Sequence, residues 1–137
     1  MVSGARSKAR KRALDILFAA DLRGESAVDA LDRAIEEGNA PTNAYTAELV
    51  RGVVERRDRI DEVLRQFSQA WTLERMPAVD RNVLRIGVYE LLFCDDVPDP
   101  VAVSEAMSLV TELSTDESPQ FVNGVLGAIQ RSKSSLV

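Results

Sequence analysis

The stretch from Val79 to Phe93, VDRNVLRIGVYELLF, constrains the fold more than any other part of the chain. Valine, isoleucine and leucine side chains fall on most sides of a helix drawn through it. A helix that is apolar around most of its circumference has to be surrounded by other helices. Pro77 upstream and Pro98 downstream interrupt helical structure on either side. We therefore predict a central helix over 79–93, on which the rest of the chain packs.

Four charged side chains interrupt this apolar helix: Asp80, Arg81, Arg85 and Glu90. Charged groups are rarely buried unless they are paired. The first two fall in the opening turn, where the carboxylate of Asp80 also interacts favourably with the helix dipole. We expect Asp80 to stand at the exposed start of the central helix.

Apolar residues at helical spacing predict five further helices, and no segment alternates as a strand does. The expected ranges are 5–22, 26–38, 43–69, 99–113 and 118–131. Gly24 and Gly38 end the first two helices, and Pro100 and Pro119 mark the starts of the last two. The sequence thus predicts an all-α protein of about six helices, three before Trp71 and three after it.

Two features of the second half are interpreted as packing. Trp71 begins the connection to the central helix, and no basic cluster adjoins it, so we expect a core residue and not a stacking platform. Gly124 and Gly127 lie inside the last helix, where each glycine costs about 1 kcal/mol. Close backbone packing would account for them.

The charge of the chain is unevenly distributed. A basic arm puts five positive charges into seven residues: Arg6, Lys8, Arg10, Lys11 and Arg12. The whole chain has 17 basic and 22 acidic side chains, so the remainder carries 12 against 22, a net charge of −10. An acidic body with a basic arm indicates a local contact with a polyanion. A second arginine cluster near residue 57 is interleaved with acids and is interpreted as a solvated surface.

The motifs of common enzymes are missing. The chain has no histidine, no CxxC pair, no glycine-rich phosphate loop and no serine nucleophile motif. We therefore expect a binding protein with no catalytic residues, no cofactor and no metal; a site built from carboxylates alone is the enzymatic alternative. The single cysteine, Cys94, cannot form an intrachain disulfide, and no apolar run is long enough to span a membrane. These features favour a cytoplasmic location.

Three stretches together resemble the family of NusB-type transcription antitermination factors. They are VDRNVLRIGVYELL with the following DVP (79–98), VAVSEAMSL (101–109) and STDESPQFVNGVLGAI (114–129). The string FVNGVL is the most specific of these signals, and ARSKARKRALDILFAADLRG is similar to the family's arginine-rich first helix. The resemblance implies a single domain over 1–137, made of two small three-helix bundles that share one core. The bundles would span roughly 5–70 and 71–133, with a disordered N-terminus and a short C-terminal tail.

The resemblance also implies a function. Members of the family bind the boxA element of nascent ribosomal RNA leader transcripts together with the small-subunit ribosomal protein NusE. The pair helps RNA polymerase to read through terminators, so the polymerase complex is an indirect partner, and no membrane is involved. Some members form homodimers. Two alternatives stay open at this point: a protein-binding helical adaptor without RNA specificity, and a small helical DNA-binding regulator.

Site residues are carried over from the same resemblance. The residues expected to meet RNA are Arg6, Lys8, Arg10, Phe18, Asp116, Gln120 and Phe121, and Asp80 would face NusE. Phe18 is equally well explained by core packing against Leu14, four residues earlier. Asp116 competes with ordinary loop capping. Phe121 is favoured as an RNA contact because it follows a helix start, where backbone N–H groups are free to meet phosphate.

Overall fold

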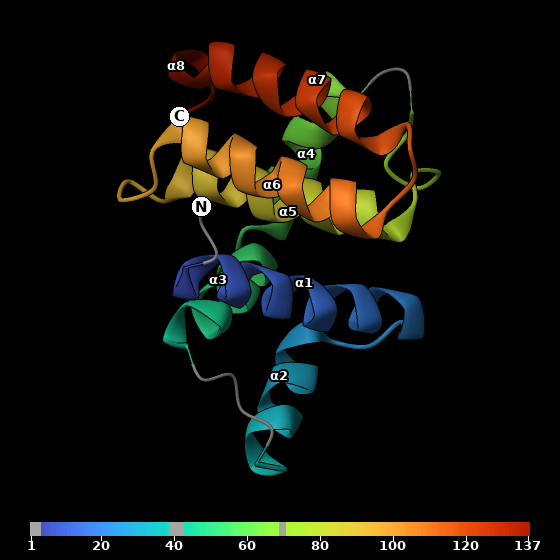
Figure 1. Cartoon of the computed structure of the whole chain (residues 1–137), viewed down its shortest axis with the longest axis vertical. Helices are drawn as coiled ribbons and strands as arrows, with labels where there is room; N and C mark the ends of the chain where they lie inside the picture. Colours follow the sequence, from blue (N-terminus) through green and yellow to red (C-terminus); the bar gives the residue numbers. More distant parts are fainter. Residues whose placement is uncertain (1–3, 39–42, 69–70) are drawn as a thin grey trace. The chain divides into compact units, whose positions relative to one another are not determined.

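The computed structural model describes residues 4–38, 43–68 and 71–137, and every regular element within these ranges is an α-helix (Figure 1). The described helices are α1 (Ala5–Arg23), α2 (Ala27–Glu36), α3 (Ala44–Glu55), α4 (Arg57–Phe67), α5 (Ala78–Phe93), α6 (Asp99–Leu113), α7 (Ser118–Arg131) and α8 (Lys133–Leu136). The predicted all-α fold is confirmed. The described ranges hold eight helices, whereas six were expected. Residues 1–3 of the N-terminus that we expected to be disordered lie outside the described residues.

The connection between α1 and α2 follows the local signals in the sequence. Gly24 ends α1 with φ 66° and ψ 32°, a left-handed conformation that glycine adopts without steric cost. The Glu25 N–H then donates to the Ala20 carbonyl oxygen at 3.0 Å. At the start of α2 the Ser26 hydroxyl oxygen accepts from the Asp29 N–H at 3.2 Å and so caps the helix.

The single long helix predicted over 43–69 is wrong. It is divided at Arg56, whose φ of −101° and ψ of 12° are not helical, so α3 ends at Glu55 and α4 begins at Arg57. The break separates two compact units, one up to Glu55 and one from Arg56 onward. We expected the chain to divide near residue 70. The apolar residues of the predicted helix pack into two different cores. One straight helix could place them in only one core.

In the first unit, α1 contacts both α2 and α3, and α2 contacts α3. The apolar side chains of Leu14, Leu31 and Leu49 are fully buried. A hydrogen bond from the Thr46 hydroxyl to the Ala9 carbonyl oxygen, at 3.0 Å, fixes α3 against α1. The basic arm therefore belongs to a helix that packs against both α2 and α3.

In the second unit, α5 contacts α4, α6, α7 and α8, and Figure 1 shows α5 and α6 side by side. Eleven of the sixteen residues of α5 are buried, which confirms the prediction of a central helix for this unit. Helix α8, at the C-terminal end, lies where we expected a short C-terminal tail. The Lys133 ammonium group donates to Asp99 Oδ1 at 2.9 Å and fixes this tail to the start of α6.

The close helix packing occurs at a different glycine from the ones predicted. A Cβ at Gly124 would meet no heavy atom within 4 Å, and one at Gly127 would meet only the side chain of Arg131, on the same helix. The packing explanation for these two glycines is wrong. Gly87 of α5 is the close approach, since a Cβ there would lie 3.0 and 3.1 Å from the two methyl carbons of Leu126.

Helix α5 buries a charged side chain and pairs it with α4. Arg85 is 4% exposed, and its guanidinium donates to both carboxylate oxygens of Asp61, from Nε at 2.9 Å and from Nη2 at 3.2 Å. Arg85 Nη1 also donates to the Asn82 side-chain oxygen at 3.3 Å. The more exposed Arg57 adds a third hydrogen bond to Asp61, at 3.1 Å. Bidentate pairing of this kind fixes orientation as well as separation.

Within the described ranges, the structure contains no helix of the length and hydropathy needed to cross a membrane. Nor does any group of three cysteine, aspartate or glutamate side chains in those ranges form a cage for a metal ion.

We predict that Asp61→Ala lowers the free energy of unfolding by about 3–5 kcal/mol, because it removes the carboxylate that neutralises a buried guanidinium. Chemical denaturation measures this change. Arg57→Ala is the matched control, since its side chain is 46% exposed and such pairs contribute about 0–1 kcal/mol. Equal losses in the two variants would contradict this account of the Asp61–Arg85 pair.

We also predict opposite effects for two glycine-to-alanine changes. Gly87→Ala should lower the free energy of unfolding by about 1–2 kcal/mol, because overpacking against buried Leu126 outweighs the gain in helix propensity. Gly124→Ala should raise it by about 0.5–1 kcal/mol, since the added methyl group meets open space. Thermal denaturation of both variants checks the signs. Stabilisation by Gly87→Ala would show that Leu126 moves aside freely.

Candidate nucleic-acid interface

The basic arm lies in the first two turns of α1. Arg6, Lys8 and Lys11 are exposed and Arg12 is half-buried. Four cations thus reach solvent from one rigid helix. These positive charges attract a polyanion. Because a helix carries them, their backbone has little conformational freedom to lose on binding.

Arg10, the remaining member of the arm, has a different role. It is 4% exposed, and its guanidinium carbon lies 5.6 Å from the centroid of the Tyr45 ring on α3. Burial on this scale contradicts the expectation that Arg10 meets RNA phosphates. Arg6 lies over the same ring at 4.2 Å, but its side chain is exposed. Cation–π contacts with Tyr45 therefore orient one exposed and one buried arginine.

Phe18, two turns further along α1, is half-buried. Part of its ring is covered and part is exposed, so the structure is compatible with both core packing and contact with a base.

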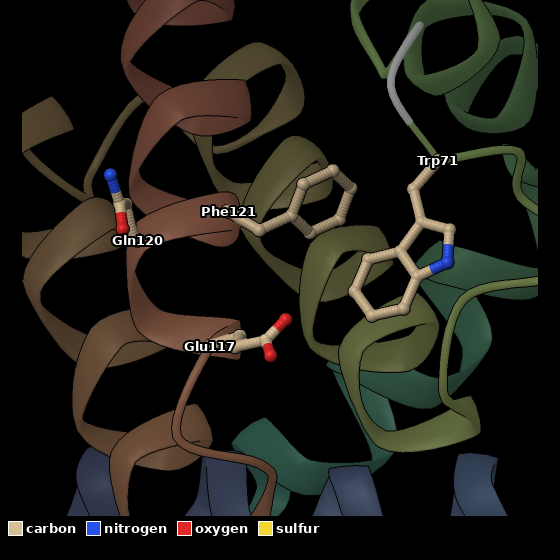
Figure 2. A pocket seen from close by; sticks show the side chains of 4 residues that line it. All are labelled: Trp71, Glu117, Gln120 and Phe121. Carbon is tan, nitrogen blue, oxygen red and sulfur yellow. The ribbon is translucent and has the colours of Figure 1, made fainter.

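A hollow at the start of α7 brings together side chains from two distant parts of the second unit. The described residues that line it are Trp71, Glu117, Gln120 and Phe121, and its volume is about 490 Å³. We call this cavity, lined by these four residues, the aromatic hollow. The Trp71 and Phe121 rings meet edge to face, with centroids 5.2 Å apart and ring planes at 78°. Figure 2 shows the two rings pointing toward one another, Glu117 pointing toward the space beside them and Gln120 pointing away.

A cluster of hydroxyl groups positions the start of α7. The Ser114 hydroxyl donates to Asp80 Oδ1 and lies 3.0 Å from the Ser118 hydroxyl, which lies 2.8 Å from that of Thr115. Asp80 is 0% exposed, so the expectation that it stands at the exposed start of the central helix is wrong. Its carboxylate faces the turn between α6 and α7, and a group so covered does not itself meet a partner protein. Among the described residues, its Oδ2 atom has no hydrogen-bond partner.

The backbone at the start of α7 is less open to phosphate than we expected. The Ser118 N–H donates to the Thr115 carbonyl oxygen at 3.2 Å, and the Phe121 N–H donates to that of Glu117 at 3.4 Å. Pro119 has no N–H at all. What this helix start offers a ligand is therefore the Phe121 ring and not a set of backbone donors.

The structure brings together two of the predicted residues and adds two that were missed. Gln120 and Phe121 line the aromatic hollow, whereas Asp116 is exposed in the preceding turn and is not among the lining residues. The interpretation of Trp71 as a core residue is wrong, since it is half-buried beside an open hollow. Glu117 precedes Phe121 by four residues, and this helical spacing could have indicated a shared surface.

Comparison with known proteins settles the family. The model of the NusB family matches residues 7–131. The chain belongs to the NusB family. A protein of a Nocardioides species, called transcription antitermination protein NusB, is 75% identical over 132 residues, which are 96% of this chain and 98% of the relative. The protein of the same name from Pseudarthrobacter chlorophenolicus is 59% identical over 133 residues. The alignment covers 97% of this chain and 98% of that relative.

Solved NusB structures share the fold of this NusB-family chain. T. maritima NusB superimposes with a TM-score of 0.83 at 31% identity, covering 96% of this chain and 93% of that one. A chain from a crystal structure of the antitermination factors NusB and NusE in complex with dsRNA superimposes with a TM-score of 0.82 at 30% identity. That alignment covers 96% of this chain and 99% of the other.

Proposed function

We propose that this protein is a transcription antitermination factor that binds boxA RNA of nascent ribosomal RNA leader transcripts together with the ribosomal protein NusE. The observation that carries the proposal is family membership over 7–131, with a 75% identical relative that bears the name of antitermination protein. A structural relative solved with NusE and dsRNA supports both kinds of partner. The protein would act in the cytoplasm, where transcription takes place, and would reach RNA polymerase only through this assembly.

Two surfaces supply chemistry suited to RNA. The exposed cations of the basic arm would contact phosphates, which supply affinity without sequence information. The Phe121 ring, in the aromatic hollow, would stack on an unpaired base, as aromatic side chains do in the recognition of single-stranded RNA. Gln120 adds an amide at the same helix start, and Phe18 and Asp116 are secondary candidates for contacts with the RNA.

A role in binding and not in catalysis is supported by the chemistry of these surfaces. Cations and aromatic rings hold a nucleic acid without making or breaking bonds. The rest of the chain, at a net charge of −10, attracts a basic ribosomal protein over long range. Because Asp80 is buried, we place the NusE contact on the exposed surface of the protein and not on that carboxylate.

We predict that RNA affinity falls with salt through the basic arm. If its four solvent-accessible cations all met phosphates, the slope of log K against log salt would be at most about −2.8, at roughly −0.7 per contact. Replacing Arg6, Lys8 and Lys11 with alanine should make the slope about 2 less steep and preserve the helical circular dichroism spectrum. Fluorescence anisotropy at several salt concentrations measures this.

A control with the same change in net charge separates local contact from general attraction. Arg33, Arg51 and Arg65 are exposed, lie outside the arm and pair with acids. Replacing these three with alanine should leave the slope nearly unchanged. An arm variant with the slope of the unmodified protein would show that the arm does not contact phosphates.

The proposed function predicts positive coupling between the two partners. The protein should bind boxA-like single-stranded RNA more tightly than scrambled RNA or duplex DNA, and NusE should increase that affinity. Linkage requires RNA to increase the affinity for NusE by the same factor. Titrations of each partner with and without the other test this, and solution mass in the same samples distinguishes a monomer from a homodimer.

The outcomes separate the alternatives. Equal affinity for boxA and scrambled RNA, with normal NusE binding, would indicate a protein-binding adaptor. Preference for duplex DNA would indicate a DNA-binding regulator. Either result would contradict the proposed function.

A further inference from the structure

The aromatic hollow has the dimensions and lining of a small ligand site. Its volume of about 490 Å³ falls within the roughly 300–1,000 Å³ that such sites occupy. The rings of Trp71 and Phe121 are both half-buried, so each keeps part of its surface open to solvent. Because the two rings meet edge to face, a flat ligand can lie against the face of one and meet the edge of the other.

The Trp71 side of the hollow is held firmly by its neighbours in the chain. Leu73 and Met76, which follow it, are 2% and 3% exposed. Arg81 of α5 donates from Nη1 to the carbonyl oxygens of both residues, at 3.1 and 3.3 Å. The Trp71 N–H donates to the Ser68 carbonyl oxygen at 3.3 Å. A wall fixed in this way loses little conformational freedom when a ligand binds.

Glu117 is the residue of the hollow whose negative charge is not explained by attraction of RNA. Glu117 is exposed, its side chain points toward the space beside the rings, and its carboxylate has no hydrogen-bond or ion-pair partner among the described residues (Figure 2). A carboxylate beside a polyanion is repelled by its phosphates. It becomes favourable only if the ligand offers it hydrogen-bond donors, because an ionised carboxylate accepts and does not donate.

We propose that the aromatic hollow binds one unstacked RNA base, with Trp71 and Phe121 as its walls and Glu117 selecting a base that carries an exocyclic amino group. The proposal rests on the function proposed above and adds to it two residues and a preference among bases. Trp71 would contact the base directly, and Glu117 would accept from its amino group.

The preference follows from the edges of the four bases. Guanine, cytosine and adenine each present an amino group, and guanine adds a ring N–H beside it, so a carboxylate can accept two hydrogen bonds from guanine. Uracil presents one N–H between two carbonyl oxygens, which repel a carboxylate. A site built to accept a hydrogen bond discriminates against a ligand that cannot donate it. Uracil should therefore be the base bound least well.

Trp71 is the chain's single tryptophan, so its fluorescence reports directly on the hollow. Titration with boxA-like RNA should quench it. Trp71→Ala should weaken RNA binding about 5- to 150-fold, the range that corresponds to loss of one base stack, and Trp71→Phe should restore most of the affinity. Thermal denaturation of both variants separates this effect from loss of the fold. Unchanged RNA affinity in a folded Trp71→Ala variant would overturn the proposal that the aromatic hollow binds a base.

The preference among bases is tested with RNAs that differ at one position. We expect one position at which cytosine binds at least about 5-fold more tightly than uracil, or guanine than inosine, the lower end of what one good base contact provides. Glu117→Gln should reduce that ratio to near one, because an amide both donates and accepts. Asp95→Asn, which removes the same charge from an exposed residue outside the lining, should keep the ratio. Absence of such a position, or a ratio that survives Glu117→Gln, would overturn the selection by Glu117.

Failure of this proposal is distinguishable from failure of the proposed function. Tight, NusE-coupled binding of boxA RNA that is insensitive to Trp71→Ala would remove the pocket and leave the function in place. Absence of boxA binding by the unmodified protein would remove the function, and the pocket with it.

Discussion

The second unit is organised by the burial of a charged group in α5. Arg85 is almost completely buried, and Asp61 of α4 supplies the carboxylate that a buried guanidinium requires. Such a pair contributes little net stability compared with well-packed apolar side chains, yet removing one partner is costly. We infer that its effect is geometric: the two hydrogen bonds fix α4 against α5 at one register. The connection that carries Trp71 starts from the end of α4, so its starting point is fixed too.

The sequence was informative about the fold where the signal was local. Helix α5 was predictable because nearly all of its circumference is apolar, and the end of α1 because Gly24 permits a left-handed turn. The division at Arg56 was not predictable, since nothing around it disfavours a helix. It depends on which core receives each half of the apolar stripe, and that is decided by residues far away in the chain.

The candidate site shows the same limit in its side chains. Gln120 and Phe121 were found because the FVNGVL string resembles a family. Trp71 was misinterpreted because only its sequence neighbours were considered, while the ring it meets lies fifty residues later. Asp80 was expected to be exposed because it lies in the first turn of the central helix, and Arg10 was expected to meet RNA because of the resemblance to the family. Their burial depends on Ser114 and Tyr45, partners that helical periodicity does not identify.

The polar residues of α5 determine where both walls of the aromatic hollow lie. Asp80 accepts from Ser114 and so positions the hydroxyl cluster from which α7 begins, one turn before Phe121. Arg81 fixes the carbonyl groups that follow Trp71, and Arg85 fixes the helix that precedes it. A stacking site requires its rings to be in place before the base arrives, because ordering them afterwards reduces affinity. A change in α5 that leaves the fold intact would therefore alter RNA binding without contact with RNA, because it would move one wall relative to the other.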